Sequence, residues 1–215
     1  AWGWTKDMRV HRLEWDPVAR KHKEDKVIDR FAEAIPAKLW VHSHDDGTRW
    51  DFTKLENEWD IKGSVYYTLG LSDMNGVQPE DMAKLYQMSD CLSMLSGSEG
   101  FGVPIIEAAA CGIPSVYTEY SGHGEVGAIC KGLGVPYTGW EPAPASHVRW
   151  VYPDVNLGIQ AFYRLAQTGT TMNKKEALSK IVAKTFDYDL IAKQWFDVLQ
   201  KVYETPLVVT YGTKL

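Results

Sequence analysis

The stretch that decides the fold is CLSMLSGSEGFGVPIIEAAACG, residues 91–112. Its first five residues form a short apolar run that predicts a strand, and a glycine-rich turn follows over residues 96–104. Pro104 suits the first turn of a helix, because a residue there needs no N–H partner. Gly112 then closes that helix. The stretch therefore predicts a strand, a turn and a helix in immediate succession.

Strand and helix patterns alternate along the rest of the chain. Further strands are expected over residues 8–13, 38–42, 64–69 and 113–118. The strand over residues 38–42 is expected to be buried. Helices are expected over residues 26–34, 52–59, 79–88, 156–167, 174–184 and 190–203. We expect residues 121–124 to form a small-residue loop and residues 132–153 to be the least regular part. The alternation predicts an α/β fold: a Rossmann-like parallel sheet with helices on both faces.

The composition is that of a globular protein, and it disfavours some classes of function. The chain has 215 residues, of which 45% are hydrophobic and 24% charged, and we expect a single domain over residues 1–215. The net charge of -5 disfavours nucleic acid as a partner. Three cysteines without CxxC spacing and no long apolar run indicate a cytoplasmic protein, with peripheral membrane contact left open. The chain begins at Ala1 without methionine, so we interpret it as a fragment or a processed product.

Two carboxylates frame the glycine-rich turn. Glu99 lies just before the expected helix and Glu107 about one turn inside it. Gly100 and Gly102 carry no side chain, so a ligand can approach the backbone and the free N–H groups at the helix start. This arrangement suits a ligand with phosphate and hydroxyl groups. The simpler alternative is that Glu99 caps the helix and Glu107 is a solvated residue.

These residues resemble the signature of the group-1 glycosyltransferases, a retaining family of two-domain GT-B architecture. The resemblance lies in SEGFGVPIIEA at residues 98–108, with its two glutamates, and in CGIP at residues 111–114. Residues 85–90, residues 121–125 and the final helix with Trp195 resemble the flanking parts, so coverage runs from about Val27 to Tyr203. The resemblance implies the C-terminal donor-binding half of a GT-B fold, closed by a helix over residues 189–204. The N-terminal acceptor domain would then be absent from this chain.

The resemblance also implies roles for individual residues. Glu107 would bind the ribose of a UDP- or GDP-sugar, and Glu99 would contact the donor sugar. Backbone N–H groups around Phe101, Gly102 and Val103 would face the sugar and diphosphate. Gly100 has no side chain and would leave room for the ligand. Gly70 and Leu71 would lie near the base. Arg20 and Lys21 best match a basic pair that reaches the diphosphate, since Lys21 is expected to precede a helix. However, Trp15 and Asp16 stand where the family places a Gly-Arg pair, so Arg20 and Lys21 could equally form a solvated turn.

The implied mechanism has no protein nucleophile. Glu99, Lys21 and Arg20 would form the catalytic group: the basic pair stabilises the departing diphosphate while an acceptor hydroxyl of a glycan, lipid or small molecule attacks from the same face. No cofactor and no metal are required, and the group His42, His44, Asp45 and Asp46 is interpreted as a polar loop. We expect the isolated chain to bind nucleotide without transferring sugar. The alternatives are a non-catalytic nucleotide-binding or scaffolding module and, ranked last, a GT-B phosphatase or epimerase of nucleotide sugars.

Overall fold

The computed structural model describes the backbone of residues 3–4, 10–16 and 21–28, and describes in full residues 37–43, 51–68, 76–143 and 148–205. The chain divides into two compact units, Ala1–Met82 and Ala83–Leu215. Each unit is described by itself below. The expectation of one domain over residues 1–215 stays a prediction.

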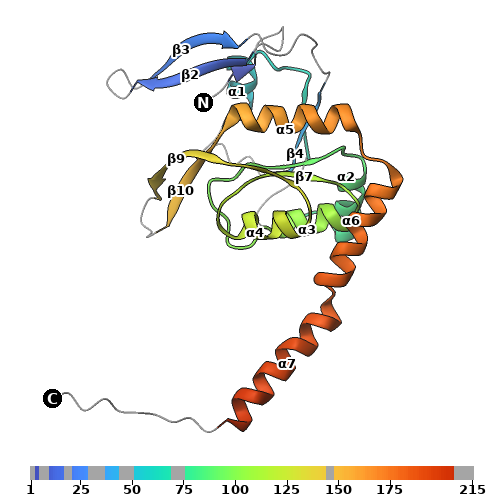
Figure 1. Cartoon of the computed structure of the whole chain (residues 1–215). Helices are drawn as coiled ribbons and strands as arrows, with labels where there is room; N and C mark the ends of the chain where they lie inside the picture. Colours follow the sequence, from blue (N-terminus) through green and yellow to red (C-terminus); the bar gives the residue numbers. More distant parts are fainter. Residues whose placement is uncertain are drawn as a thin grey trace, which may run out of the picture. The chain divides into compact units, whose positions relative to one another are not determined.

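A parallel sheet forms the centre of the unit Ala83–Leu215. Its strands are β6 (Leu92–Met94), β7 (Ser115–Thr118) and β8 (Leu133–Val135), arranged in the order β6-β7-β8. Helices α3 (Val103–Ala110) and α4 (Ser121–Ile129) cover one face of this sheet, and α5 (Val155–Thr168) covers the other (Figure 1). The predicted α/β fold with helices on both faces is therefore confirmed.

The core of this unit lies between the sheet and helices α3 and α4. Ile105 and Ala109 of α3 pack with Tyr117 of β7 and with Val126 and Cys130. Small residues let the helices approach the sheet closely. A Cβ atom at Gly127 of α4 would lie only 2.5 Å from the Tyr117 ring, so a larger residue there would overlap the ring.

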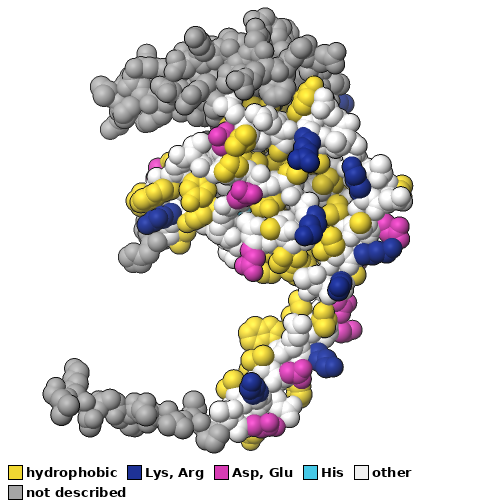
Figure 2. Space-filling view, in the orientation of Figure 1, with side chains coloured by type: hydrophobic (Ala, Val, Ile, Leu, Met, Phe, Trp, Pro, Cys, Tyr) yellow, Lys and Arg dark blue, Asp and Glu magenta, His cyan; other side chains and the backbone are white. Residues whose placement is uncertain are grey.

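Three helices end the described chain, as expected. They are α5, α6 (Met172–Thr185) and α7 (Tyr188–Glu204), and each begins with a side chain that accepts a hydrogen bond from a backbone N–H. The capping residues are Asp154, Thr171 and Asp187, which accept from the N–H groups of Leu157, Lys174 and Leu190. Hydrophobic side chains gather along α7 on the surface (Figure 2), where Trp195 is 63% exposed. Among the residues that the structure describes, no helix is long and apolar enough to cross a membrane.

Two segments expected to be irregular are regular. Residues 121–124 were expected as a loop, but they form the first turn of α4. Residues 132–153 were expected to be irregular, but they contain β8 and an antiparallel hairpin of β9 (Tyr137–Pro142) and β10 (Arg149–Pro153). Both expectations were wrong because they gave weight to local glycine and proline. Close packing favours the glycines of α4, and the aromatic residues of the hairpin suit strands.

The unit Ala1–Met82 contains two small sheets. Strands β1 (Gly3–Trp4), β2 (Val10–Asp16) and β3 (Lys21–Ile28) are antiparallel, whereas β4 (Leu39–Val41) and β5 (Val65–Tyr67) are parallel. Helix α1 (Phe52–Glu58) and the first residues of α2 (Pro79–Gln87) complete it, as expected. The strands near residues 8–13, 38–42 and 64–69 are also confirmed.

Two expectations for this unit were wrong. The helix over residues 26–34 begins inside β3, which pairs with β2 along its whole length, so strand pairing outweighs the helical spacing of Val27 and Ile28. Residues 29–36 lie outside the described part. Strand β4 was expected to be buried, but Leu39 is 50% exposed and Trp40 39% exposed.

Removal of the Ile105 side chain tests this core. Ile105 is completely buried at the centre of α3, whereas Val103 on the same helix is half exposed. We expect Ile105→Ala to lower the free energy of unfolding by about 2–5 kcal/mol, because it removes buried surface and leaves a cavity. The matched variant Val103→Ala should cost less than about 1 kcal/mol. Urea unfolding followed by circular dichroism measures both. Equal losses in the two variants would contradict this placement of the core.

Candidate functional site

The candidate site begins where β6 ends, in the turn that leads into α3. Gly102 is the residue before the helix and has a φ angle of +93°, in the region that favours glycine. No side chain caps this helix start within the described residues, and Pro104 brings no N–H to be satisfied. The start of α3 therefore keeps its partial positive charge available to a ligand.

The first turn of α4, which follows β7, packs directly against the turn that leads into α3. The Ser121 hydroxyl donates to the Glu99 carbonyl and accepts from the Glu99 N–H at 3.1 Å, and the Gly122 N–H also donates to the Glu99 carbonyl at 3.3 Å. Contact is so close that a Cβ atom at Gly122 would lie 2.4 Å from the Gly100 carbonyl oxygen. A Cβ atom at Gly102 would likewise lie 2.8 Å from that of His123. Glycine at 102 and 122 is therefore a condition for this packing.

Glu107 lies on the exposed side of α3 and has a defined partner. Its carboxylate accepts a hydrogen bond of 2.8 Å from the hydroxyl of Tyr86, a residue of α2. Burial raises the pKa of the Tyr86 phenol, and the hydrogen bond to Glu107 raises it further. Tyr86 therefore stays protonated and holds one carboxylate oxygen of Glu107. The alternative that Glu107 is merely solvated does not account for this contact.

Glu99 lies beside His123, a histidine with no exposed surface. Burial lowers the pKa of His123, and the negative charge of Glu99 opposes that shift. The Ser96 backbone also favours the charged ring, but neither ring nitrogen makes a hydrogen bond of normal geometry to any described residue. The ring is therefore a buried polar group with unused hydrogen-bonding capacity, which is uncommon in folded proteins.

The remaining predicted residues belong to the other unit or lie outside the described part. Arg20, Gly70 and Leu71 are outside the described residues. Lys21 was expected to precede a helix. Instead it is the first residue of β3, where it pairs with Asp16 of β2. The expectation was wrong because Lys21 pairs with β2 in an antiparallel sheet.

Metal ligands do not gather among the described residues, where no group of three or more His, Cys, Asp or Glu side chains could hold an ion. The ring of His42 contacts the Thr68 hydroxyl at 2.9 Å. The predicted polar loop over His44, Asp45 and Asp46 lies outside the described residues.

The predicted site residues did not include Tyr86, Ser121 or His123, and His123 was interpreted as a loop histidine that is more often structural than catalytic. Tyr86 looked like one member of an apolar helix face, and its contact with Glu107 joins residues 21 positions apart. Ser121 and His123 lie among glycines, and this composition favours the prediction of a loop. The available signal was Gly122 between them, because a glycine there allows two backbones to meet.

Known proteins similar to this chain are glycosyltransferases, in agreement with the resemblance seen in the sequence. Residues 73–131 match the family described as "Glycosyl transferases group 1". N-acetyl-alpha-D-glucosaminyl L-malate synthase of Bacillus anthracis is 38% identical over 129 residues, or 57% of this chain and 31% of that protein. D-inositol 3-phosphate glycosyltransferase of Rhodococcus erythropolis is 38% identical over 113 residues, or 50% of this chain and 25% of that protein. The chain thus spans less than a third of the curated relatives.

A solved structure supports the same fold. Sucrose-phosphate synthase from Thermosynechococcus elongatus superposes with a TM-score of 0.58 at 22% identity, covering 77% of this chain and 38% of that one. The resemblance to group-1 glycosyltransferases seen in the sequence is therefore confirmed.

The buried histidine predicts a loss of stability in acid. Because the pKa of His123 is lowered in the folded state, the unfolded chain binds a proton first as the pH falls through about 6.5. The free energy of unfolding should therefore fall by up to about 1 kcal/mol between pH 7.5 and 5.5 on account of this residue. Urea titrations at both pH values should show a smaller fall for His123→Phe than for the wild type.

The variant Glu99→Gln provides a second test of the same pH dependence. It removes the charge that favours the protonated ring, so the acid-induced loss should be at least as large as in the wild type. An identical pH dependence in the wild type and in His123→Phe would show that this ring is not the group responsible.

Proposed function

We propose that this chain, whose residues 73–131 match the family of group 1 glycosyl transferases, is the donor-binding part of a retaining hexosyltransferase. The enzyme would transfer a sugar from a UDP- or GDP-sugar to an acceptor hydroxyl, with its N-terminal acceptor domain supplied outside these 215 residues. The observation that supports this best is the uncapped start of α3, with Glu99 just before it and Glu107, held by Tyr86, just inside it.

Glu107 would bind the ribose of the nucleotide. A carboxylate accepts hydrogen bonds at two oxygens, and two neighbouring hydroxyls on one ribose match that geometry. Tyr86 already occupies the Glu107 oxygen Oε2, at 2.8 Å. This contact restricts the rotation of the carboxylate, so less conformational entropy is lost when the ribose binds.

The diphosphate would lie at the start of α3. Backbone N–H groups around Phe101, Gly102 and Val103 would face it, because a helix start carries partial positive charge. Gly100 and Gly102 bring no side chains that would keep the phosphates away. Glu99 would accept hydrogen bonds from hydroxyls of the donor sugar.

The transfer would depend on stabilising charge. As the bond from the sugar carbon to the diphosphate breaks, negative charge grows on the leaving oxygen, and the partial positive charge at the α3 start would stabilise it. The acceptor hydroxyl attacks from the face that the diphosphate leaves, which retains the configuration. We propose that this scheme needs no metal or cofactor and that the reaction takes place in the cytoplasm.

A second candidate is a non-catalytic nucleotide-binding module. One observation favours it: Lys21 begins a strand, and Trp15 and Asp16 stand where the family has a Gly-Arg pair. A chain that lacks the basic clamp could keep ribose and phosphate binding but lose turnover. Assay of the full-length protein with UDP- and GDP-sugars separates the two candidates, because only the first transfers sugar.

Calorimetry with UDP and GDP tests the nucleotide site in this chain. We expect one of the two to bind, and Glu107→Ala to weaken it at least about tenfold, because hydrogen bonds to a charged group contribute about 1.5–3 kcal/mol each. Tyr86→Phe should weaken binding less, since it frees the carboxylate without removing it. Glu176→Ala, an exposed glutamate of α6 paired with Lys180, is the matched control and should change nothing. Unchanged affinity in Glu107→Ala, or no binding of either nucleotide, would refute this site.

A further inference from the structure

The hairpin of β9 and β10 sorts its side chains onto two different faces. In its register Trp150 lies opposite Glu141, Tyr152 opposite Gly139, and Val151 opposite Trp140. Residues that face each other across antiparallel strands point to the same side, and successive residues alternate. One face therefore carries Glu141, Trp150 and Tyr152. The other carries Trp140 and the buried Val151, with Arg149 stacked on the Trp140 ring at 4.3 Å.

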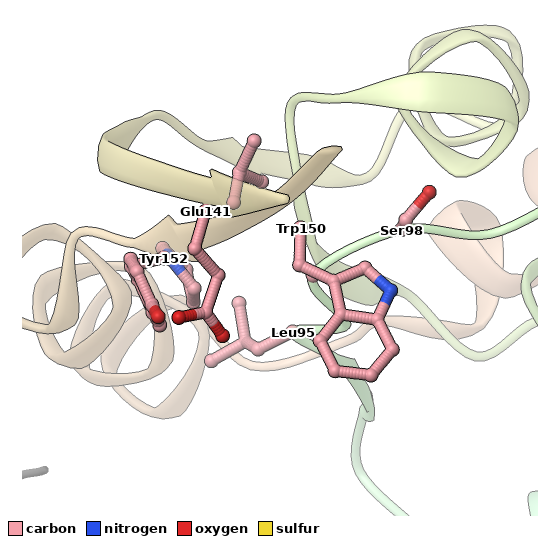
Figure 3. Close-up of a pocket in the computed structure, with 8 residues that line it drawn as sticks. Leu95, Ser98, Glu141, Trp150 and Tyr152 are labelled. Atoms are coloured by element: carbon pink, nitrogen blue, oxygen red, sulfur yellow. The ribbon is translucent and has the colours of Figure 1, made fainter. Parts of the chain in front are cut away.

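The first of these faces lines a hollow of about 390 Å³ (Figure 3). Leu95, Gly97 and Ser98 close its other side, and these residues connect β6 to the turn of the nucleotide site. Trp150 and Tyr152 are each nearly half exposed, so their rings remain available to a ligand. The hollow is therefore open, aromatic on one side and bordered by polar groups.

The polar groups of the hollow suit a neutral ligand with hydroxyl groups. Figure 3 shows the Glu141 carboxylate and the Tyr152 hydroxyl directed toward each other. The hydrogen bond to Glu141 is the main reason why the pKa of Tyr152 rises to about 12, so the phenol stays protonated and orients the carboxylate. The second Glu141 oxygen can then accept hydrogen bonds from ligand hydroxyls. A phosphate or carboxylate ligand would instead be repelled by Glu141.

The hairpin is fixed to the main chain of the candidate site. The Val151 N–H donates to the Gly97 carbonyl at 3.0 Å, and a Cβ atom at Gly97 would lie 3.0 Å from the Val151 carbonyl oxygen. Ser98, which lines the hollow, directly precedes Glu99. The hollow therefore begins one residue from the carboxylate to which we assign the donor sugar.

We propose that this hollow binds the pyranose ring of a saccharide. A pyranose has a face of C–H groups that packs on an aromatic ring and a rim of hydroxyls that donate to a carboxylate. Trp150 supplies the ring and Glu141 the acceptor, whereas the phosphates of a nucleotide would be repelled by the negative charge of Glu141. The saccharide comes either from the acceptor or from the donor, and only this choice of source rests on the function proposed above.

Saturation-transfer NMR with this chain tests the proposal. The probes are the methyl pyranosides of glucose, mannose, galactose and N-acetylglucosamine, each at millimolar concentration. We expect saturation of the ring C–H protons of at least one probe, weakened about fivefold or more in Trp150→Ala, because stacking on the indole is lost. Trp150→Phe should restore part of the signal. Trp140→Ala, an equally exposed tryptophan on the opposite face, should leave it unchanged.

The outcomes are distinct. Saturation of no probe, or equal saturation in the wild type and Trp150→Ala, overturns the proposal, as does displacement of a bound pyranoside by free UDP or GDP. Nucleotide calorimetry on the same sample shows whether the nucleotide site survives such a failure. When a pyranoside does bind, competition by the sugar moiety of a UDP- or GDP-sugar assigns the hollow to the donor. Simultaneous binding of both assigns it to the acceptor.

Discussion

The close contact between the turn after β6 and the first turn of α4 is the constraint on which the rest of the site depends. The two segments approach until the Gly122 backbone touches Gly100 and the Gly102 backbone touches His123. Ser121 joins them by hydrogen bonds in both directions with the Glu99 backbone, and has a positive φ angle of 55° itself. A side chain at 102 or 122 would push the turn after β6 away from α4, and the starts of α3 and α4 would move apart.

This constraint places the chemical groups of the nucleotide site. The charge of Glu99 acts on the buried ring of His123, and the α3 start follows Glu99 directly in the chain. One turn further along α3, Glu107 is held by Tyr86. The proposed roles follow from these positions: the backbone amides bind the phosphates, Glu107 binds the ribose and Glu99 binds the sugar. The aromatic hairpin adds a second surface, tied to the same turn through Gly97.

The sequence was most informative where local chemistry and tertiary packing agree. Pro104 and Gly112 marked both ends of α3, and the apolar run before them marked β6. It was least informative where long-range contacts decide. Gly122 and Gly124 read as a loop because their low helix propensity is visible in the sequence, whereas the backbone that they approach is not. Strand β3 was missed because its partner β2 overrides local spacing, and Tyr86 because its partner lies on another helix.

The order of the parallel sheet bears on how the molecule folds. Strands β6, β7 and β8 are neighbours in space as well as in sequence, and each crossover consists of a single short helix. Contacts between nearby parts of a chain close small loops, which costs less entropy and favours fast folding. The central layer can therefore assemble from one continuous segment as it leaves the ribosome, before α5, α6 and α7 have been synthesised.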